Sequence, residues 1–303
     1  MSLTRRLFLT TGIAASAAAM TRIAESTAEQ TSSGTGRNLE RALGITMSSV
    51  ARLETKAGPL RYTMLEWPKI LRDELDMTIL DLNSGVMRSH EPAYLDAVRQ
   101  AAADAGCVLT NMKINRADVD IGNSDAAVRA GAVEECKRWI ETASRLGLRW
   151  ARPLPLKAVP NRKGFIEAYR ELVDFAAERN VQMVIENYGW MDGDATIVPS
   201  LLAEIGGNVA PCPDTGNWSS AEVRYAGLAN MFPRAVSCDF KASKLGPAGE
   251  HQAWDLKRCF EIGWGAGFRG PWCFEHAHTD RDQLFRELRL LRDMLRQWMA
   301  AKS

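Results

Sequence analysis

The chain has 303 residues, of which 46% are hydrophobic and 25% are charged, so it can bury a large core. Its 38 basic and 37 acidic residues give a formal net charge of +1, which argues against the basic surface typical of nucleic-acid-binding proteins. The length suits either one α/β barrel or two ordinary domains.

The first residues in chain order, 1–28, have the pattern of an export signal. The paired arginines of Thr4-Arg5-Arg6-Leu7-Phe8-Leu9 precede a weakly apolar run of small residues, Gly12–Ala19. Short length and small residues at the end favour an export signal over a membrane anchor. We therefore expect a periplasmic or otherwise exported protein that uses the twin-arginine pathway and is cleaved after Ala19 or Ala28.

A predicted linker and one long domain follow the signal. Residues 29–41 are rich in Ser, Thr and Gly, as linkers often are. We expect the folded domain to occupy residues 42–303. No stretch within it reaches the run of about 18 apolar residues that a membrane-spanning helix needs.

The six cysteines are expected to be reduced core residues. The sequence has no C-x-x-C pair of the kind that holds structural zinc. A free cysteine in a buried strand behaves as a small hydrophobic residue. Four of the six lie in strand-like runs: Cys107, Cys212, Cys238 and Cys273.

From residue 42 onward, strand-like and helix-like stretches alternate without a break. The expected strands are 43–47, 77–82, 107–114, 149–154, 181–186, 208–213, 235–240 and 271–275. The expected helices are 62–75, 92–105, 125–146, 163–179, 196–205, 221–231, 254–262 and 280–300. Eight such units close a (β/α)8 TIM barrel of about 250 residues. An open doubly wound sheet would normally show a glycine-rich phosphate turn after an early strand, and none is present. We therefore predict a single-domain α/β protein with the TIM barrel fold.

Three of the expected strands end in an acid or are directly followed by one: Glu186, Asp214 and Glu275. The carboxyl ends of parallel strands meet at one rim, where ligands bind. Carboxylates gathered there repel one another unless a cation lies between them. A divalent metal ion is the simplest such cation, and Asp239 on the seventh strand is a fourth possible ligand. Ligation by oxygen alone suits Mg²⁺, Mn²⁺ or Ca²⁺ better than Zn²⁺.

A metal ion at this rim would suit proton-transfer chemistry. It can polarise two neighbouring oxygens of a hydroxy-carbonyl substrate, while its glutamate ligands move a proton between adjacent carbons. Such a site runs an isomerisation or an epimerisation without a redox cofactor. Other polar residues expected at the same rim are Asp81, Asn83, Asn111, Lys113, Arg152, Asn187, Lys241, His276 and His278.

Several motifs resemble the sugar phosphate isomerase/epimerase group of the xylose isomerase-like TIM barrels. They are Ile185-Glu186-Asn187, Pro213-Asp214-Thr215-Gly216-Asn217-Trp218 and Phe274-Glu275, and the resemblance extends over about residues 42–300. It implies a divalent ion (Mn, Mg or Co) held by acids that include Glu186, Asp214 and Glu275. It also implies that Glu186 and Glu275 act as acid and base on a sugar or keto-sugar. Members of the group often form dimers or tetramers.

The seventh strand departs from this group. The usual pattern is a histidine followed two residues later by lysine, whereas this chain has Asp239-Phe240-Lys241. Asp239 could replace the histidine as a ligand, or it could be a partner of Lys241. Alternatively, the chain belongs to a subgroup without the histidine, or His251 in the following loop completes the site.

Four residues are candidates for substrate binding. Arg152 and Lys241 would suit an anionic or polyhydroxyl substrate, although Arg152 could instead pair with Asp81. His276 follows the last acid, and Trp218 could stack on a sugar face, although most tryptophans are simply packed.

Three further functions share this fold. A keto-sugar lyase or dehydratase would use the same acids. A carbohydrate-binding barrel with a degenerate metal site would have no activity. A metal-dependent endonuclease at abasic DNA sites would need more histidine ligands and a basic surface, whereas this chain has four histidines and a balanced charge.

Overall fold

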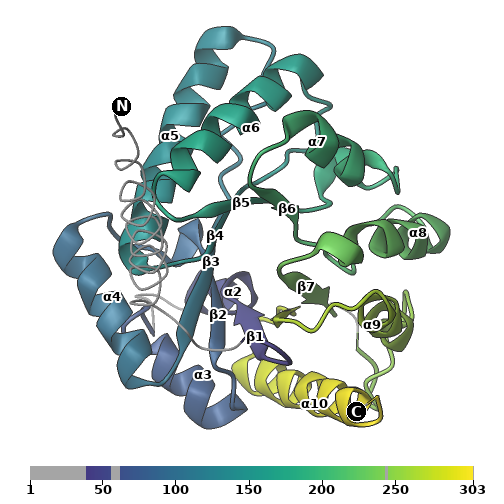
Figure 1. Ribbon diagram of the computed structural model, residues 1–303. Helices are drawn as coiled ribbons and strands as arrows, with labels where there is room; N and C mark the ends of the chain where they lie inside the picture. Colours follow the sequence, from purple (N-terminus) through teal and green to yellow (C-terminus); the bar gives the residue numbers. More distant parts are fainter. Residues whose placement is uncertain (1–38, 56–61, 243–244, 303) are drawn as a thin grey trace, which may run out of the picture. The chain divides into compact units, whose positions relative to one another are not determined.

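The computed structural model describes residues 39–55, 62–242 and 245–302, so the predicted export signal and most of the predicted linker lie outside the described residues. Within the described part, eight parallel strands curl into a barrel-like sheet with helices around it (Figure 1). The strands are β1 (Leu43–Thr46), β2 (Ile79–Asn83), β3 (Val108–Ile114), β4 (Trp150–Pro153), β5 (Gln182–Ile185), β6 (Val209–Pro211), β7 (Cys238–Lys241) and β8 (Trp272–Glu275). The predicted (β/α)8 fold is confirmed.

Strand pairing runs in the order β6-β5-β4-β3-β2-β1-β8-β7, which leaves β6 and β7 to close the barrel. They meet just beyond the end of β6, through a parallel bridge between Asp214 and Asp239. The Asp239 backbone N–H donates to the Pro213 carbonyl at 2.9 Å, and the Thr215 N–H donates to the Asp239 carbonyl at 3.0 Å. The backbone of two predicted site acids therefore closes the barrel.

The helices lie between successive strands. They are α2 (Ser48–Thr55), α3 (Trp67–Leu75), α4 (Pro92–Asp104), α5 (Ala126–Leu146), α6 (Arg162–Ala177), α7 (Ile197–Ile205), α8 (Ala221–Met231), α9 (Leu256–Gly265) and α10 (Arg281–Ala300). Their ends follow ordinary capping chemistry. Asp125 accepts from the Ala127 and Val128 amides at 2.7 and 3.3 Å to begin α5, and Gly147 ends that helix with φ of 73°.

One helix prediction needs correction, and one helix was missed. The helix expected over residues 62–75 begins only at Trp67, where Pro68 occupies its first turn. Proline is favoured at that position because it has no amide hydrogen to satisfy. Helix α2, directly after β1, was not predicted.

The core has two parts, which follow the two-residue period of the strands. The outer part packs the sheet against the helices. The inner part fills the barrel with side chains such as Trp150 and Val184. Two residues further along the same strands, the inward positions carry charge, with Arg152 on β4 and Glu186 just after β5. The barrel is therefore apolar at its centre and charged at the carboxyl ends of its strands.

Two further predictions concern the cysteines and the membrane. All six cysteines are free and buried, as expected. No helix in the described part of the chain is long and apolar enough to cross a bilayer.

Candidate metal and catalytic site

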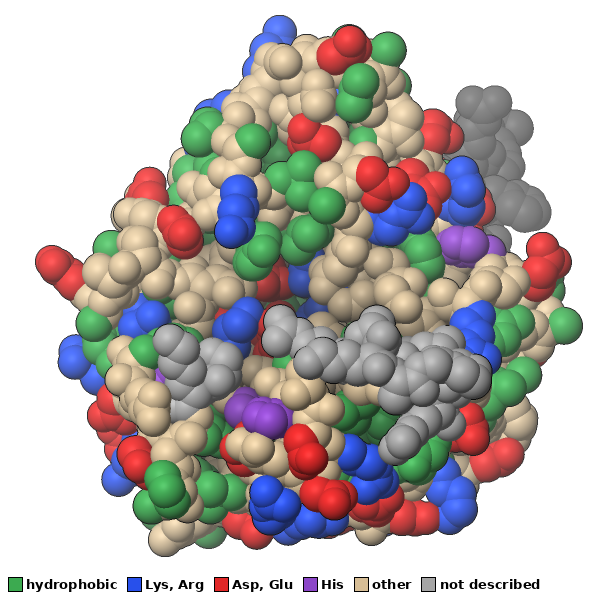
Figure 2. Space-filling model, turned by 180° about the vertical axis from the view of Figure 1, so that it is seen from behind, with side chains coloured by type: hydrophobic (Ala, Val, Ile, Leu, Met, Phe, Trp, Pro, Cys, Tyr) green, Lys and Arg blue, Asp and Glu red, His purple; other side chains and the backbone are tan. Residues whose placement is uncertain are grey.

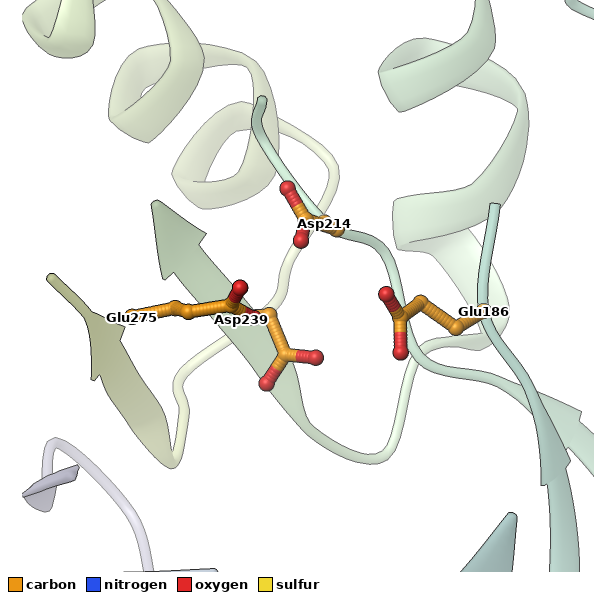
Figure 3. Close-up of side chains that lie close together, drawn as sticks. All are labelled: Glu186, Asp214, Asp239 and Glu275. Carbon is orange, nitrogen blue, oxygen red and sulfur yellow. The ribbon is translucent and has the colours of Figure 1, made fainter. Parts of the chain in front are cut away.

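The four predicted metal ligands converge at the carboxyl ends of β5 to β8. One carboxylate oxygen from each of Glu186, Asp214, Asp239 and Glu275 lies within 4.8 Å of the others. In Figure 3, Glu186 and Glu275 reach inward from opposite sides, with Asp214 and Asp239 between them. The first three side chains are buried, whereas that of Glu275 is 23% exposed. Asp239 thus lies with the three strand-end acids.

Asp214 uses its two carboxylate oxygens in different ways. Oδ1 accepts from the Gly216 and Asn217 backbone amides at 2.5 and 3.1 Å, which is the turn that its Asp-Thr-Gly-Asn sequence favours. Oδ2 accepts from the Asn217 side-chain amide at 2.7 Å and lies 3.4 Å from Lys241 Nζ. Asp214 can therefore form the turn with Oδ1 and still present Oδ2 to the other acids of the site.

Two amide side chains hold the acids in position. The Asn187 side chain donates to the Asp214 carbonyl at 3.0 Å and accepts from the Asp214 amide at 2.8 Å, which ties the end of β5 to the end of β6. The Asn217 side chain donates to Glu186 Oε1 at 2.9 Å as well as to Asp214. Sequence reasoning gave neither asparagine a role, although both belong to the motifs that carried the resemblance.

Three cations are paired with these acids. Arg152 lies 2.6 Å from Glu186 Oε2, and Lys241 Nζ lies 2.6 Å from Glu275 Oε1. The Lys113 ammonium donates to Asp239 Oδ1 and lies 3.6 Å from Asp81. Both open choices of partner are thereby resolved, because Arg152 pairs with Glu186 rather than Asp81, and Asp239 pairs with Lys113 rather than Lys241.

The charges of this cluster do not cancel. Five acids (Asp81, Glu186, Asp214, Asp239 and Glu275) meet three cations (Lys113, Arg152 and Lys241), which leaves two negative charges if all are ionised. Burial raises the pKa of Asp214 to about 7. Lys241 acts to lower this pKa, but the nearby carboxylates Glu275 and Glu186 act to raise it. Burial also raises the pKa of Asp239 well above its usual range, against the effect of Lys113. Burial alone would raise the pKa of Glu275, but Lys241 and Lys113 bring it below its usual value.

The acids fit a divalent metal ion. Ligands on opposite sides of an ion are about 4.2 Å apart for Mg²⁺ and about 5 Å apart for Ca²⁺, twice the metal–oxygen distance. The 4.8 Å limit on the spread of the four oxygens falls in this range. Asp239 Oδ2 is buried without a hydrogen-bond partner, so it has an unused lone pair. With all five acids ionised and Lys241 in place, the excess of two negative charges equals the charge of one such ion.

The two candidate histidines, His276 and His251, both lie outside the acidic cluster. His276 is buried, and its Nε2 pairs with Glu287 on α10, while burial lowers the pKa of its ring. His251 packs its ring on Trp254, with 3.7 Å between centroids, and its Nδ1 accepts from the Ala253 and Trp254 amides. Among the described residues, the acidic cluster has no histidine member. His251 thus shapes its own loop rather than completing the site.

Trp218 is part of the core and not a platform for a sugar. Its indole N–H donates to the Asp214 carbonyl at 2.9 Å, and the residue is 7% exposed. The ring packs so closely on α8 that a Cβ at Gly227 would lie 2.1 Å from it. The expectation that Trp218 stacks on substrate does not agree with this position.

Comparison with known proteins agrees with the architecture. Residues 78–294 match the family described as xylose isomerase-like TIM barrel. The chain belongs to this family. No curated protein sequence matches it.

Solved structures share the same barrel at low sequence identity. A xylose isomerase domain protein from Planctomyces limnophilus is 15% identical, with a TM-score of 0.65 over 86% of this chain and 98% of its own. D-psicose 3-epimerase from Clostridium cellulolyticum H10, solved with D-tagatose, is 14% identical, with a TM-score of 0.68 over 84% and 98%. A xylose isomerase-like TIM barrel protein from Mycobacterium smegmatis in complex with magnesium is 17% identical, with a TM-score of 0.62 over 88% and 98%.

Lys113 is another residue of this xylose isomerase-like barrel whose role sequence reasoning missed. It was expected at the rim without a partner, yet its side chain is 1% exposed and lies between Asp81 and Asp239. The available signal was a lysine within the apolar run of β3. A buried lysine requires acidic partners, because an unpaired buried charge is very costly.

Proposed function

We propose that this protein is a metal-assisted isomerase or epimerase that acts on a sugar or keto-sugar. The convergence of four carboxylates at the carboxyl ends of β5 to β8 is the observation that carries the proposal. Similarity to D-psicose 3-epimerase supports a keto-sugar as the substrate class. The face seen in Figure 2 carries acidic and basic side chains interspersed, which does not favour a DNA substrate.

Glu186, Asp214, Asp239 and Glu275 would hold the ion, with Asp239 supplying its unused Oδ2. The identity of the ion, Mn²⁺, Mg²⁺ or Co²⁺, is left to experiment, although a magnesium-bound relative supports a divalent metal. When bound, such an ion would polarise a carbonyl and a neighbouring hydroxyl of the substrate and so acidify the C–H hydrogen on the carbon that carries the hydroxyl.

The two glutamates are placed to move the proton. They enter from opposite sides of the space between them, so one, as a carboxylate, can remove a proton from one face and the other, as a carboxylic acid, can donate its own proton to the opposite face (Figure 3). The lowered pKa of Glu275 keeps it ionised, as a base must be. Arg152 and Asn217 fix Glu186 through contacts of 2.6 and 2.9 Å.

Of the four predicted substrate-binding residues, Lys241 has the most suitable position. Its side chain is 21% exposed, whereas Arg152 and His276 are each 3% exposed and paired with acids. We assign Lys241 to contact with substrate oxygens. Arg152 is assigned the positioning of Glu186.

The test is exchange of substrate hydrogen for deuterium. The metal-loaded protein is incubated in D2O with a panel of ketopentoses and ketohexoses, and NMR follows deuterium incorporation and the appearance of epimer or aldose. We expect exchange that falls at least 100-fold in Glu186→Gln and in Glu275→Gln. Glu204→Gln, at an exposed acid paired with Arg162, is the matched control and should retain full activity.

Other outcomes identify the competing functions. Exchange accompanied by loss of water from the substrate would indicate a lyase or dehydratase. Sugar binding without exchange would indicate a carbohydrate-binding barrel and would refute the enzymatic proposal.

A further inference from the structure

Lys241 lies where a metal ion would have to compete with it. Its ammonium is 2.6 Å from Glu275 Oε1 and 3.4 Å from Asp214 Oδ2, and both acids belong to the candidate metal site. It also donates to Asn217 Oδ1 at 3.0 Å. A lysine ammonium and a divalent ion repel each other strongly when they share carboxylates in a low-dielectric site.

Lys241 is also the most exposed of the three cations of this site. Lys113 is 1% exposed between two acids, and Arg152 is 3% exposed between Glu186 and Asn115. The Lys241 side chain is 21% exposed, while its backbone amide donates to the Thr215 hydroxyl at 2.9 Å and its carbonyl accepts from the same hydroxyl at 3.2 Å. Its stem lies over Gly216, where a Cβ would be 2.5 Å from Lys241 Cδ, so the glycine leaves room for it.

We propose that Lys241 is a displaceable counter-cation of the acidic cluster. It neutralises Glu275 and Asp214 while no metal is bound, and it turns toward solvent when a divalent ion takes its place. This inference rests on the metal-binding part of the proposed function. The released ammonium can then donate to an oxygen of an entering substrate. Metal loading would in this way prepare the site for the sugar, and metal would bind before substrate.

The experiment measures the accessibility of the Lys241 amine directly. The chelator-treated full chain is acetylated briefly with and without saturating Mn²⁺, and mass spectrometry quantifies each lysine. Acetylation of Lys241 should rise at least fivefold with Mn²⁺. Lys113, at 1% exposure, should stay unreactive in both states, and Lys163, at 87% exposure, should react equally in both.

Calorimetric titration with Mn²⁺ on the same sample separates the possible failures. Binding without a rise at Lys241 would overturn the displacement and leave the metal site intact. Absence of binding would overturn both the displacement and the metal-dependent function. Lys241→Met supplies an independent measurement, because removal of the competitor should tighten Mn²⁺ binding about tenfold. Lys163→Met should leave binding unchanged, and equal or weaker binding by Lys241→Met would contradict the proposal.

Discussion

Lys113 extends across the barrel interior from β3 to β7, where its ammonium meets Asp239. Burial would lower the pKa of this lysine, but Asp239 and Asp81 raise it well above the usual range. Lys113 is therefore held charged, and Asp239 is its nearest acidic partner in a site with almost no solvent. Removal of one member of such a pair costs about 3–5 kcal/mol, mainly because the other is left as an uncompensated buried charge.

We therefore predict that Lys113→Met and Asp239→Asn each lower the free energy of unfolding by about 3 kcal/mol or more in the metal-free protein. The double variant should lose much less than the sum of both, and urea denaturation of all four proteins gives the coupling energy. Lys163→Met, which removes an exposed ion pair with Glu167, should change stability by less than about 0.5 kcal/mol. Additive losses would show that the two charges do not depend on each other.

Asp214 makes metal binding depend on pH. Its pKa is raised from an ordinary 3.8 to about 7, so below this pH the carboxyl group is protonated and a metal ion must displace the proton. The contribution of Asp214 should make the affinity for Mn²⁺ rise by up to about tenfold per pH unit up to about pH 7, where this contribution ends. The same shift stabilises the metal-free fold in acid, and this contribution is lost as the pH rises through about 7. Titrations from pH 5.5 to 8.5 measure the slope, and a flat profile would contradict the assignment.

At the scale of elements, β1 lies unusually close to β2. A Cβ at Gly44 would lie 2.6 Å from both the Cβ and the carbonyl oxygen of Ile79, so only glycine fits there. We predict that Gly44→Ala costs about 1–3 kcal/mol, because the strands must separate. Gly131 lies on the exposed side of α5, where a Cβ would meet no neighbouring atom within 4 Å, and Gly131→Ala should stabilise by about 0.5–1 kcal/mol. Thermal unfolding of both variants tests the opposite signs.

The elements themselves were accessible from the sequence. Each of the eight strands begins within three residues of its expected start. The helix over residues 221–231 has the predicted bounds. Helix α2 was missed because it follows β1 directly, with no loop signal to separate them.

The sequence does not allow prediction of which side chains pair within the site. Strand ends could place Asp239 and Lys113 at one rim, but their contact joins residues 126 positions apart and depends on how the barrel closes. The same holds for Arg152, for which the sequence suggested Asp81 and which pairs with Glu186. Burial of Trp218 depends on a glycine in the next helix, which no local pattern connects with it.

At the scale of the whole molecule, the expected export route affects where the protein would fold and bind its metal ion. Residues 1–28 have the twin-arginine pattern, and that pathway carries proteins that are already folded. A fold with six buried free cysteines suits assembly in the reducing cytoplasm, since no disulfide has to form after export. We propose that the barrel folds around its acidic cluster, and takes up its metal, before it leaves the cytoplasm.

This proposal predicts where the protein accumulates when the paired arginines are changed. In a bacterial host with the twin-arginine pathway, the full chain should be found in the periplasmic fraction. Arg5→Lys combined with Arg6→Lys should keep it in the cytoplasm, folded and still able to bind Mn²⁺, because the substitutions lie outside the barrel. Arg37→Lys is the matched control and should not alter export. Immunoblots of fractionated cells measure the distribution, and unchanged export of the double variant would refute the twin-arginine route without affecting the proposed chemistry.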